Sequence, residues 1–285
     1  RTHKPEVSGS IPLPATILRF MKIYDCIMYF DEELILELRL NILDKYVDKF
    51  VIIEATRDHA GNKKKLNFDI KKFLKFEKKI NYLVVDDIPE KVEYYKKGWS
   101  PNFFRENFNR NAISRALTEC NPNDLIIISD ADEIPNLEVL EKIKIKKFAI
   151  FAQKNFIYKL NLLYEHNWLG SSICYKKYLK SPQWLRNKRF LRRGFLRRIL
   201  FKTQIIKDGG WHFSFLKTPE NIAKKIKAYA HGEHVGLVDV EFIKKNIEMK
   251  KCFIFPEKEL KDIPIDNSFP KYIRENKNIL SEWIL

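Results

Sequence analysis

The chain has 285 residues and a mass of 34.1 kDa, which suits one large domain or two small ones. Hydrophobic residues make up 45% of the chain and aromatic residues 13%, a composition that excludes general disorder and supports a packed core. The 53 Lys and Arg against 37 Asp and Glu give a net charge of +16. This charge predicts an anionic partner: nucleic acid, an acidic membrane surface or a phosphorylated small molecule.

In chain order, residues 1–20 lack the layout of a signal peptide, so we expect an irregular leader or expression remnant and a single domain over 21–285. The four cysteines lie far apart, without the spacing of a zinc site, and indicate free thiols in a reducing compartment. Because no apolar run approaches the ~20 residues that span a bilayer, we expect a cytoplasmic protein.

Strand-type and helix-type segments alternate through the first half of the chain. We predict strands at Lys22–Phe30, Lys49–Ala55, 80–89 and from Leu125, with helices over 31–47, 70–79, 102–120 and from Asn136. This alternation predicts an α/β fold of right-handed βα units around a mostly parallel sheet. The later runs "FAIFAQKNFIYKLN" and "SSICYKKYL" indicate an antiparallel extension, and the tail from Asp239 is helical, then irregular.

The stretch "LIIISDADEIP", Leu125 to Pro135, joins buried-type aliphatics to three acids. Asp130, Asp132 and Glu133 repel one another unless a cation or solvent separates them. Ligands of parallel sheets collect beyond the carboxyl ends of the strands, and an oxygen-rich site there suits Mg²⁺ or Mn²⁺. A solvated acidic turn before a helix, with Glu133 near the positive helix end, would give the same pattern.

A second acidic strand end is followed by a basic loop, "EATRDHAGNKKKLNF". A nucleotide would use Glu54 for a base or ribose hydroxyl and Lys64 for phosphate. Arg105 and Arg110, on the helix before the acidic strand, could reach the same pocket. A solvated basic loop and surface arginines are the plain alternatives.

The strand "KDGGWHFSFL" places Asp208 before two glycines, then Trp211 and His212. Paired glycines permit close approach of backbone to a ligand, and a strand-borne His among aromatics is a candidate ligand, although a satisfied core histidine would look the same. The later "YAHGEH" clusters two histidines with Glu233, where His could simply cap a helix.

Residues 166 to 207 contain no Asp or Glu and include "LRNKRFLRRGFLRR". Arginines interleaved with Phe and Leu could bind phosphate, nucleic acid or an anionic lipid surface, or could form a solvated helix face.

Five segments in order resemble one family, the family 17 glycosyltransferases, which includes the animal enzyme that adds the bisecting N-acetylglucosamine to N-glycans. They are "YDCIMYFDEELILELRLNIL", "KFVIIEATRDHAGNKKKLNF", "RENFNRNAISRAL", "DLIIISDADEIP" and "DGGWHFSFLKTPENIAKKIKAYAH". The resemblance implies a GT-A-like nucleotide-diphospho-sugar transferase fold, inversion at the anomeric carbon and UDP-N-acetylglucosamine as the best-known donor. Its D-x-D motif corresponds to Asp130 and Asp132, and its Gly-Trp-His to Gly210, Trp211 and His212.

The resemblance and the residues together predict a metal-dependent transferase acting on a UDP-sugar and a glycan or glycolipid acceptor, with possible contact to an anionic membrane surface. Asp132 would hold Mn²⁺ or Mg²⁺, with Asp130 directly or through water and His212 as a further ligand. Asp208 is the candidate base, with Glu165 and Glu233 as rivals, and Glu133 either reacts or orients the metal site.

The nucleotide would be positioned by Glu54, Lys64, Arg105, Arg110 and Trp211. Two other classes stay open on the residues alone: a basic nucleic-acid-binding protein, although no nucleic acid is expected as a partner of the transferase, and a metal-dependent phosphohydrolase that uses the same acids.

Overall fold

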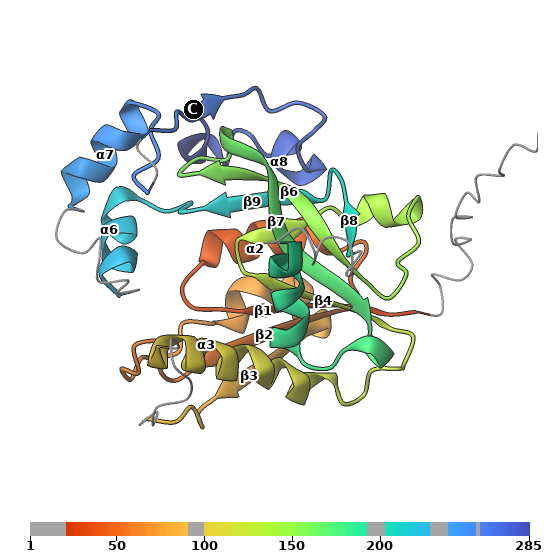
Figure 1. Ribbon diagram of the computed structural model, residues 1–285. Helices are drawn as coiled ribbons and strands as arrows, with labels where there is room; N and C mark the ends of the chain where they lie inside the picture. Colours follow the sequence, from red (N-terminus) through yellow and green to blue (C-terminus); the bar gives the residue numbers. More distant parts are fainter. Residues whose placement is uncertain (1–20, 91–99, 193–202, 229–238, 255–256) are drawn as a thin grey trace, which may run out of the picture.

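The computed structural model describes residues 21–90, 100–192, 203–228, 239–254 and 257–285. In these residues ten strands form one mixed sheet, in the order β3-β2-β1-β4-β7-β6-β9-β5, with β10 paired to β7 and β8 to β6 (Figure 1). The strands are β1 Ile23–Met28, β2 Lys49–Ala55, β3 Ile80–Val85, β4 Leu125–Asp130, β5 Glu133–Pro135, β6 Phe148–Ile157, β7 Leu162–Tyr175, β8 Gln204–Ile206, β9 Gly210–Ser214 and β10 Lys261–Asp262.

The helices lie on both faces of this sheet. The α-helices are α2 Glu33–Leu43, α3 Pro101–Ala112, α4 Pro182–Arg186, α6 Pro219–Ala228, α7 Val240–Glu248 and α8 Lys271–Glu275. The 3₁₀ helices are η1 Ile70–Lys79, η2 Ile113–Leu117, η3 Leu137–Glu141, η4 Lys176–Tyr178, η5 Asn187–Arg192 and η6 Ser281–Trp283. Within the described ranges, none of the helices has both the length and the apolar character needed to cross a membrane.

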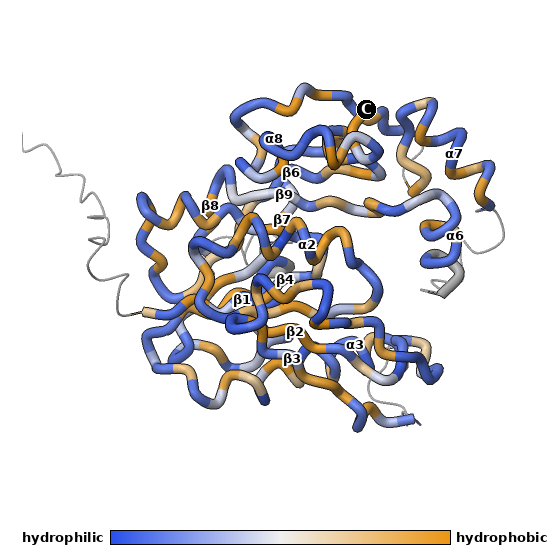
Figure 2. The backbone as a smooth tube through the Cα atoms, turned by 180° about the vertical axis from the view of Figure 1, so that it is seen from behind, coloured by the Kyte–Doolittle hydropathy of each residue, from blue (hydrophilic) through white to orange (hydrophobic). Residues whose placement is uncertain are grey.

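The strands of the first half of the chain form the parallel part of the sheet, as predicted. β1 pairs in parallel with β2 and β4, and β2 with β3. Alternate residues of these strands enter two different cores: Ile27 packs in the cluster with α2 and α8, and Cys26 in the cluster with α3 and α4. Burial on both faces explains the near-continuous aliphatic runs (Figure 2).

The antiparallel extension is also confirmed. β7 lies antiparallel to β4 and to β6, which continues the sheet beyond the parallel strands. β9 then lies parallel to β6 and antiparallel to β5, and this pairing places His212 opposite Glu133. The sheet therefore brings the "DADE" and "GWH" segments side by side, although some eighty residues of sequence separate them.

Three elements differ from the predictions. Residues 70–79 are a 3₁₀ helix with a break at Phe73, in which only Phe73 and Phe76 are buried. The helix that begins after the Ser100 cap is α-helical only to Ala112 and continues as a 3₁₀ helix. Residues 133–135 form a short strand before the helix at Asn136, and a three-residue strand has no periodicity to detect.

Candidate active site

A cavity of about 610 Å³ opens at the carboxyl ends of β1, β2 and β4, where Met28, Ala55 and Asp130 contribute to its wall. One side of the cavity is formed by α3, and another by the end of β9, by α6 and by the segment at Phe253. This is the edge at which parallel α/β sheets bind ligands, and the volume is that of a small-molecule site. Acidic and cationic side chains lie on its wall beside aromatic rings.

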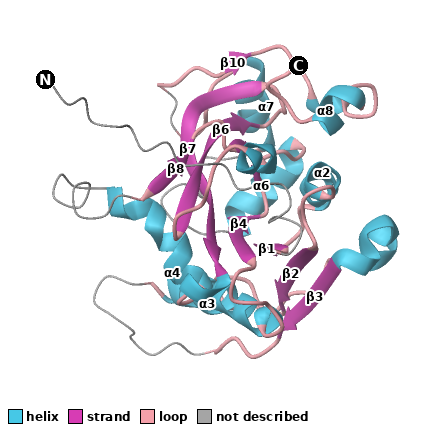
Figure 3. Ribbon diagram, turned by 90° about the vertical axis from the view of Figure 1, so that its right-hand side faces the viewer, coloured by secondary structure: helices cyan, strands magenta, loops and turns pink. Residues whose placement is uncertain are grey.

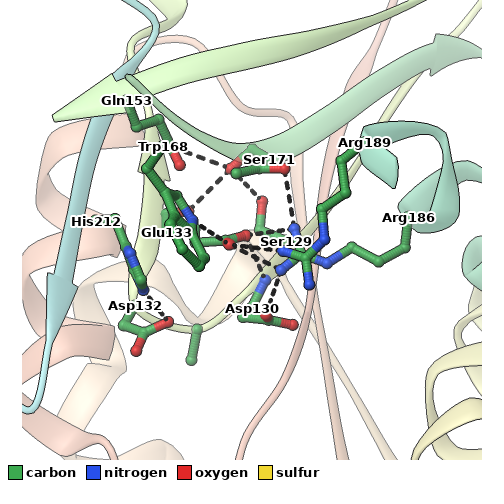
Figure 4. A network of polar contacts seen from close by, with 12 residues as sticks. Ser129, Asp130, Asp132, Glu133, Gln153, Trp168, Ser171, Arg186, Arg189 and His212 are labelled. Carbon is green, nitrogen blue, oxygen red and sulfur yellow. Dashed lines mark hydrogen bonds and ion pairs between the residues drawn. The ribbon is translucent and has the colours of Figure 1, made fainter. Parts of the chain in front are cut away.

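Asp130 lies at the tip of β4 and is held by arginines from two helices. Arg110 of α3 donates from Nη2 to Oδ1 at 3.0 Å. Arg186 of α4 donates to Oδ2 (Figure 4). Burial opposes the charge, but Arg186, Arg110 and Arg189 outweigh it and hold the pKa of Asp130 well below its usual range. The carboxylate is thus ionised, and each of its oxygens accepts a hydrogen bond from an arginine. For the predicted direct contact between Asp130 and a metal ion, the ion would have to replace one of these arginines.

Glu133 is the centre of the same cluster and has no exposed surface. Its Oε1 accepts from Trp168 Nε1 at 2.9 Å and from Arg186 at 2.7 Å, and its Oε2 accepts from Arg186 at 2.6 Å and from the Asp130 amide at 3.2 Å. Arg189 adds a longer contact of 3.4 Å. The structure therefore corrects the expectation of a reacting Glu133: its oxygens are saturated, and it orders the turn that carries Asp130 and Asp132.

Arg39, which the sequence analysis missed, holds the backbone of this turn by hydrogen bonds. Arg39 of α2 is wholly buried and pairs with Asp25 of β1 through Nε at 2.6 Å and Nη2 at 2.5 Å. Its Nη1 also donates to the carbonyl oxygens of Glu133 at 2.6 Å and Ala131 at 3.3 Å. The available signal was an aspartate within the apolar run "IYDCIM" and an arginine between two leucines in "LILELRLNIL", since a buried charge needs a partner.

Asp132 and His212 face each other across the β5–β9 pairing and both line the cavity. His212 Nε2 lies 3.5 Å from Asp132 Oδ1 and 3.0 Å from Ser214 Oγ, and its ring stacks on Trp168 at 4.7 Å. Burial disfavours the imidazolium, but Asp132 and the neighbouring carboxylates raise the pKa of His212 overall, and His212 in turn lowers the pKa of Asp132.

These two side chains are the best-placed metal ligands in the part of the chain that the structure describes. No cluster of three or more His, Cys, Asp or Glu side chains is arranged there to hold an ion. Mg²⁺ and similar ions are, however, often bound by one or two carboxylates together with substrate phosphates and water. The oxygen of Asp132 and the nitrogen of His212 fit an ion that takes its remaining ligands from a diphosphate.

Two of the residues predicted to position a nucleotide have structural partners instead. Glu54 is wholly buried and accepts from Lys64 at 2.5 Å, from the amides of Asn67 and Phe68 at 2.8 and 3.0 Å, and from Tyr82 at 3.0 Å. It therefore fastens the loop after β2 and is not open to a ligand.

Arg105 likewise holds backbone, because it donates to the carbonyls of His59, Ala60 and Glu90 at 3.0–3.3 Å. It is not among the described residues that line the cavity, whereas Lys64 and Arg110 do line it. Of the four predicted nucleotide contacts on this side, the structure thus brings two to the cavity.

Asn109 is a cavity residue that the sequence analysis missed. It is 4% exposed and lines the cavity, and its side-chain Oδ1 is buried without a hydrogen-bond donor among the residues that the structure describes. A buried amide without a partner is unfavourable by about 1–3 kcal/mol unless a ligand or water satisfies it. The signal was the polar face of α3, where Asn102, Glu106, Asn109 and Arg110 recur at helical spacing and all line the cavity.

Asp208 lies away from the cavity. It is exposed at the Gly210 end of β9, with φ +50°, whereas His212 and Ser214 at the other end line the cavity. A Cβ on Gly210 would lie 2.2 Å from the Ile134 carbonyl, and one on Gly209 2.8 Å from the Ala152 amide. The paired glycines therefore leave room for the backbone of neighbouring strands and not for a ligand. The structure does not support Asp208 as the base.

The remaining predicted residues are Trp211, Glu165 and Glu233. Trp211 is buried in the core and donates to the Ser268 carbonyl at 3.0 Å, and it is not among the cavity-lining residues. Half-buried Glu165 also lies outside that set. Glu233 and residues 193–202 of the basic stretch lie outside the described residues, while the earlier part of that stretch supplies Arg186 and Arg189 to the cluster around Glu133.

Comparison with known proteins gives one strong match. The family model described as glycosyltransferase family 17 matches residues 15–275. No curated protein matches the chain.

Among solved structures, glucosyl-3-phosphoglycerate synthase from Mycobacterium tuberculosis in complex with Mn²⁺, UDP and phosphoglyceric acid is 9% identical, with a TM-score of 0.35 over 94% of this chain and 97% of that one. The complex of that enzyme with Mn²⁺, UDP-glucose and phosphoglyceric acid is 10% identical, with a TM-score of 0.34 over the same shares. A mycobacterial protein is 12% identical, with a TM-score of 0.27 over 52% of this chain, which spans 46% of that protein. Scores this low carry no argument about function.

Proposed function

Since the chain belongs to glycosyltransferase family 17, we propose that it transfers a sugar from a UDP-sugar, with N-acetylglucosamine as the best candidate, to a hydroxyl of a glycan or glycolipid. The observation that carries this proposal is the cavity at the carboxyl edge of the parallel strands, which Asp132, His212, Arg110 and Lys64 all line. Carboxylate, imidazole and cationic groups at one edge suit a nucleotide diphosphate.

On the α3 side of the cavity we place the nucleotide. Asn109 offers an amide oxygen without a donor, which can pair with the edge of a nucleobase or with a ribose hydroxyl. Lys64 and Arg110 supply the cations that phosphate oxygens bind. Arg110 is already paired with Asp130 and Glu106, so a diphosphate would share it with, or take it from, a carboxylate.

Asp132 and His212 would hold Mn²⁺ or Mg²⁺. When bound there, the ion would neutralise negative charge on the departing diphosphate. Lys225, which lowers the pKa of Asp132 by its charge, lies near enough to add positive potential on the same side of the cavity.

Inversion requires one in-line displacement, in which a base takes the proton of the acceptor hydroxyl. The acids on the wall besides Asp130 and Asp132 are Glu32, Asp58 and Glu106. We place this role on Glu32 because of its position. Its Oε1 lies 3.1 Å from Lys225, whose charge also acts on Asp132, and this puts Glu32 near the metal ligands. Its Oε2 accepts from the amides of Phe30 and Asp31 at 3.1 Å, so the acceptor hydroxyl would have to displace Lys225 from Oε1 or share that oxygen with it. Glu106 pairs with Arg110 on the nucleotide side.

The test is transfer of radiolabelled N-acetylglucosamine from UDP-N-acetylglucosamine, with Mn²⁺ present or chelated, to a panel of glycans and glycolipids. Asp132→Asn should lower the rate by ~100-fold or more, because a bound ion contributes several kcal/mol to transition-state stabilisation. The matched control is Asp87→Asn, since Asp87 is half exposed, pairs with Arg115 and does not line the cavity. Unimpaired transfer by Asp132→Asn would remove the proposed metal role, and no transfer from UDP-N-acetylglucosamine to any of the acceptors would remove the proposed donor.

Family membership also decides between the classes left open by the residues. A nucleic-acid-binding protein and a phosphohydrolase share the charge and the acids of this chain, but the family match supports neither as its activity.

A further inference from the structure

Three aromatic residues meet on the side of the cavity opposite α3. Phe215 and Phe253 line the cavity, and Tyr158 lies buried beneath them. The Phe215 and Phe253 rings meet edge to face at 5.1 Å, and the Tyr158 and Phe253 rings stack at 6.3 Å. Tyr158 Oη also accepts a hydrogen bond from the Phe253 amide at 3.1 Å. We call these three residues the aromatic platform.

The backbone of the platform is strained in two places. Phe215 has φ +54° and Tyr158 has φ +68°, in the left-handed region that bulky residues avoid. Such a conformation is unfavourable by roughly 1–3 kcal/mol and persists where the surrounding structure enforces it, often beside functional sites. Glycine or asparagine at position 215 would adopt it with less strain. The chain therefore carries a phenylalanine where folding alone would favour a smaller residue.

The position of the platform relates it to the reaction. Phe215 follows Ser214 at the end of β9, three residues beyond His212, so its ring adjoins the wall that carries Asp132 and His212. Figures 1 and 3 show α3 on one side of the ends of β1 and β4, and α6 and α7 on the other. The nucleotide placed along α3 therefore leaves the platform side to the second substrate.

We propose that the aromatic platform binds the acceptor, with the Phe215 ring against the apolar C–H face of an acceptor sugar ring. This inference rests on the proposed function and deepens it. A flat aromatic face contacts the C–H hydrogens of one face of a pyranose, while the hydroxyls at the rim of the ring reach polar groups. Ser214, Lys225 and Glu32 line the same cavity and can receive those hydroxyls.

The experiment is saturation-transfer NMR on the full chain with UDP, using the methyl β-glycosides of glucose, galactose and mannose as probes. At least one glycoside should receive its strongest saturation on the C–H protons of a single ring face. Phe215→Leu, which keeps an apolar side chain without the aromatic face, should lower the affinity for that glycoside about three- to tenfold. Phe215→Tyr should bind it like the natural protein. UDP affinity should be unchanged in both variants, because the platform is not on the nucleotide side.

Three further variants separate a role in binding from a role in folding. Phe242→Leu is the matched control, since Phe242 is a 36% exposed phenylalanine on α7 that does not line the cavity. Phe215→Asn should keep the unfolding midpoint and lose glycoside binding, because asparagine tolerates the left-handed backbone. A lower midpoint with intact binding would instead give Phe215 a packing role only and overturn the inference. Phe253→Leu gives a second route to the platform if a Phe215 variant fails to fold.

Other results of these experiments would overturn the inference. The inference fails if no glycoside is saturated, or if Phe215→Leu and Phe242→Leu bind the glycoside equally well. Weaker UDP binding by Phe215→Leu would show that the ring stacks on the nucleobase. Transfer from UDP-N-acetylglucosamine, measured separately with the same protein preparations, reports on the proposed function. Glycoside binding without use of this UDP-sugar would leave the platform intact and remove the donor assignment.

Discussion

The buried ion pair between Asp25 and Arg39 should contribute strongly to stability and to the shape of the active site. Both side chains are at most 1% exposed, and two hydrogen bonds of 2.5 and 2.6 Å join them. Arg39→Met leaves the Asp25 carboxylate buried without its partner. It also leaves the carbonyls of Ala131 and Glu133 without the Nη1 donor that holds the metal-site turn.

The magnitude follows from these two losses. Breaking a buried pair by removing one partner is destabilising by about 3–5 kcal/mol. The orphaned carbonyls add about 1–3 kcal/mol. The sum is a large part of the ~5–15 kcal/mol by which folded domains are stable. In Asp25→Leu with Arg39→Met both charges are absent, so the first cost should largely disappear and about 1–3 kcal/mol should remain.

Urea unfolding followed by circular dichroism gives the free energies of unfolding from the midpoint and the slope. The control is Arg115→Ala, which breaks the half-exposed pair with Asp87 and should change stability by no more than ~1 kcal/mol. The reasoning is refuted if Arg39→Met is destabilising by less than ~1 kcal/mol. It is also refuted if the double variant is as unstable as Arg39→Met alone, since the cost would then not come from an unpaired charge.

Three shorter predictions test other parts of the structure. Gly210→Ala should lower the free energy of unfolding by about 2–5 kcal/mol, because φ is +126° and a Cβ would lie 2.2 Å from a neighbouring carbonyl oxygen; urea unfolding measures it. Burial raises the pKa of the Cys26, Cys120 and Cys174 thiols, but Cys120 is half-buried whereas the other three cysteines are buried, so in the native protein at pH 8 a thiol reagent should modify Cys120 first, as peptide mass spectrometry would show. Asn109→Ala should weaken UDP binding about three- to tenfold by calorimetry, and unchanged affinity would remove Asn109 from the nucleotide site.

The parallel half of the fold could be predicted because its strands are apolar on both faces and its helices have an apolar stripe. The short strand Glu133–Pro135 could not, since three residues carry no period and its pairing partner lies far along the chain. The glycines before Trp211 show the same limit. A Gly-Gly pair indicates close approach, but only the register with β5 shows that the approaching group is the Ile134 carbonyl.

The site was predictable in position more than in detail. Asp132 and His212 do line one cavity, as expected for a strand end and a neighbouring strand. Asp130 and Glu133 pair with Arg186, which follows them by 56 and 53 residues in the sequence. No local sequence pattern predicts such a long-range ion pair. Arg186 belongs to a stretch whose charge indicated an anionic ligand, and the anions that it meets are the protein's own carboxylates.

The insertion of β9 between β6 and β5 has a consequence for synthesis of the protein. β9 can take its place only after the β6–β7 hairpin exists, and it carries His212 to the turn already held by Arg39 and Arg186. A polypeptide that ends before Gly210 contains Asp132, Arg39 and Arg186 but lacks His212. Competence for catalysis should therefore emerge abruptly and late during translation, when the ribosome releases the segment that follows the hairpin.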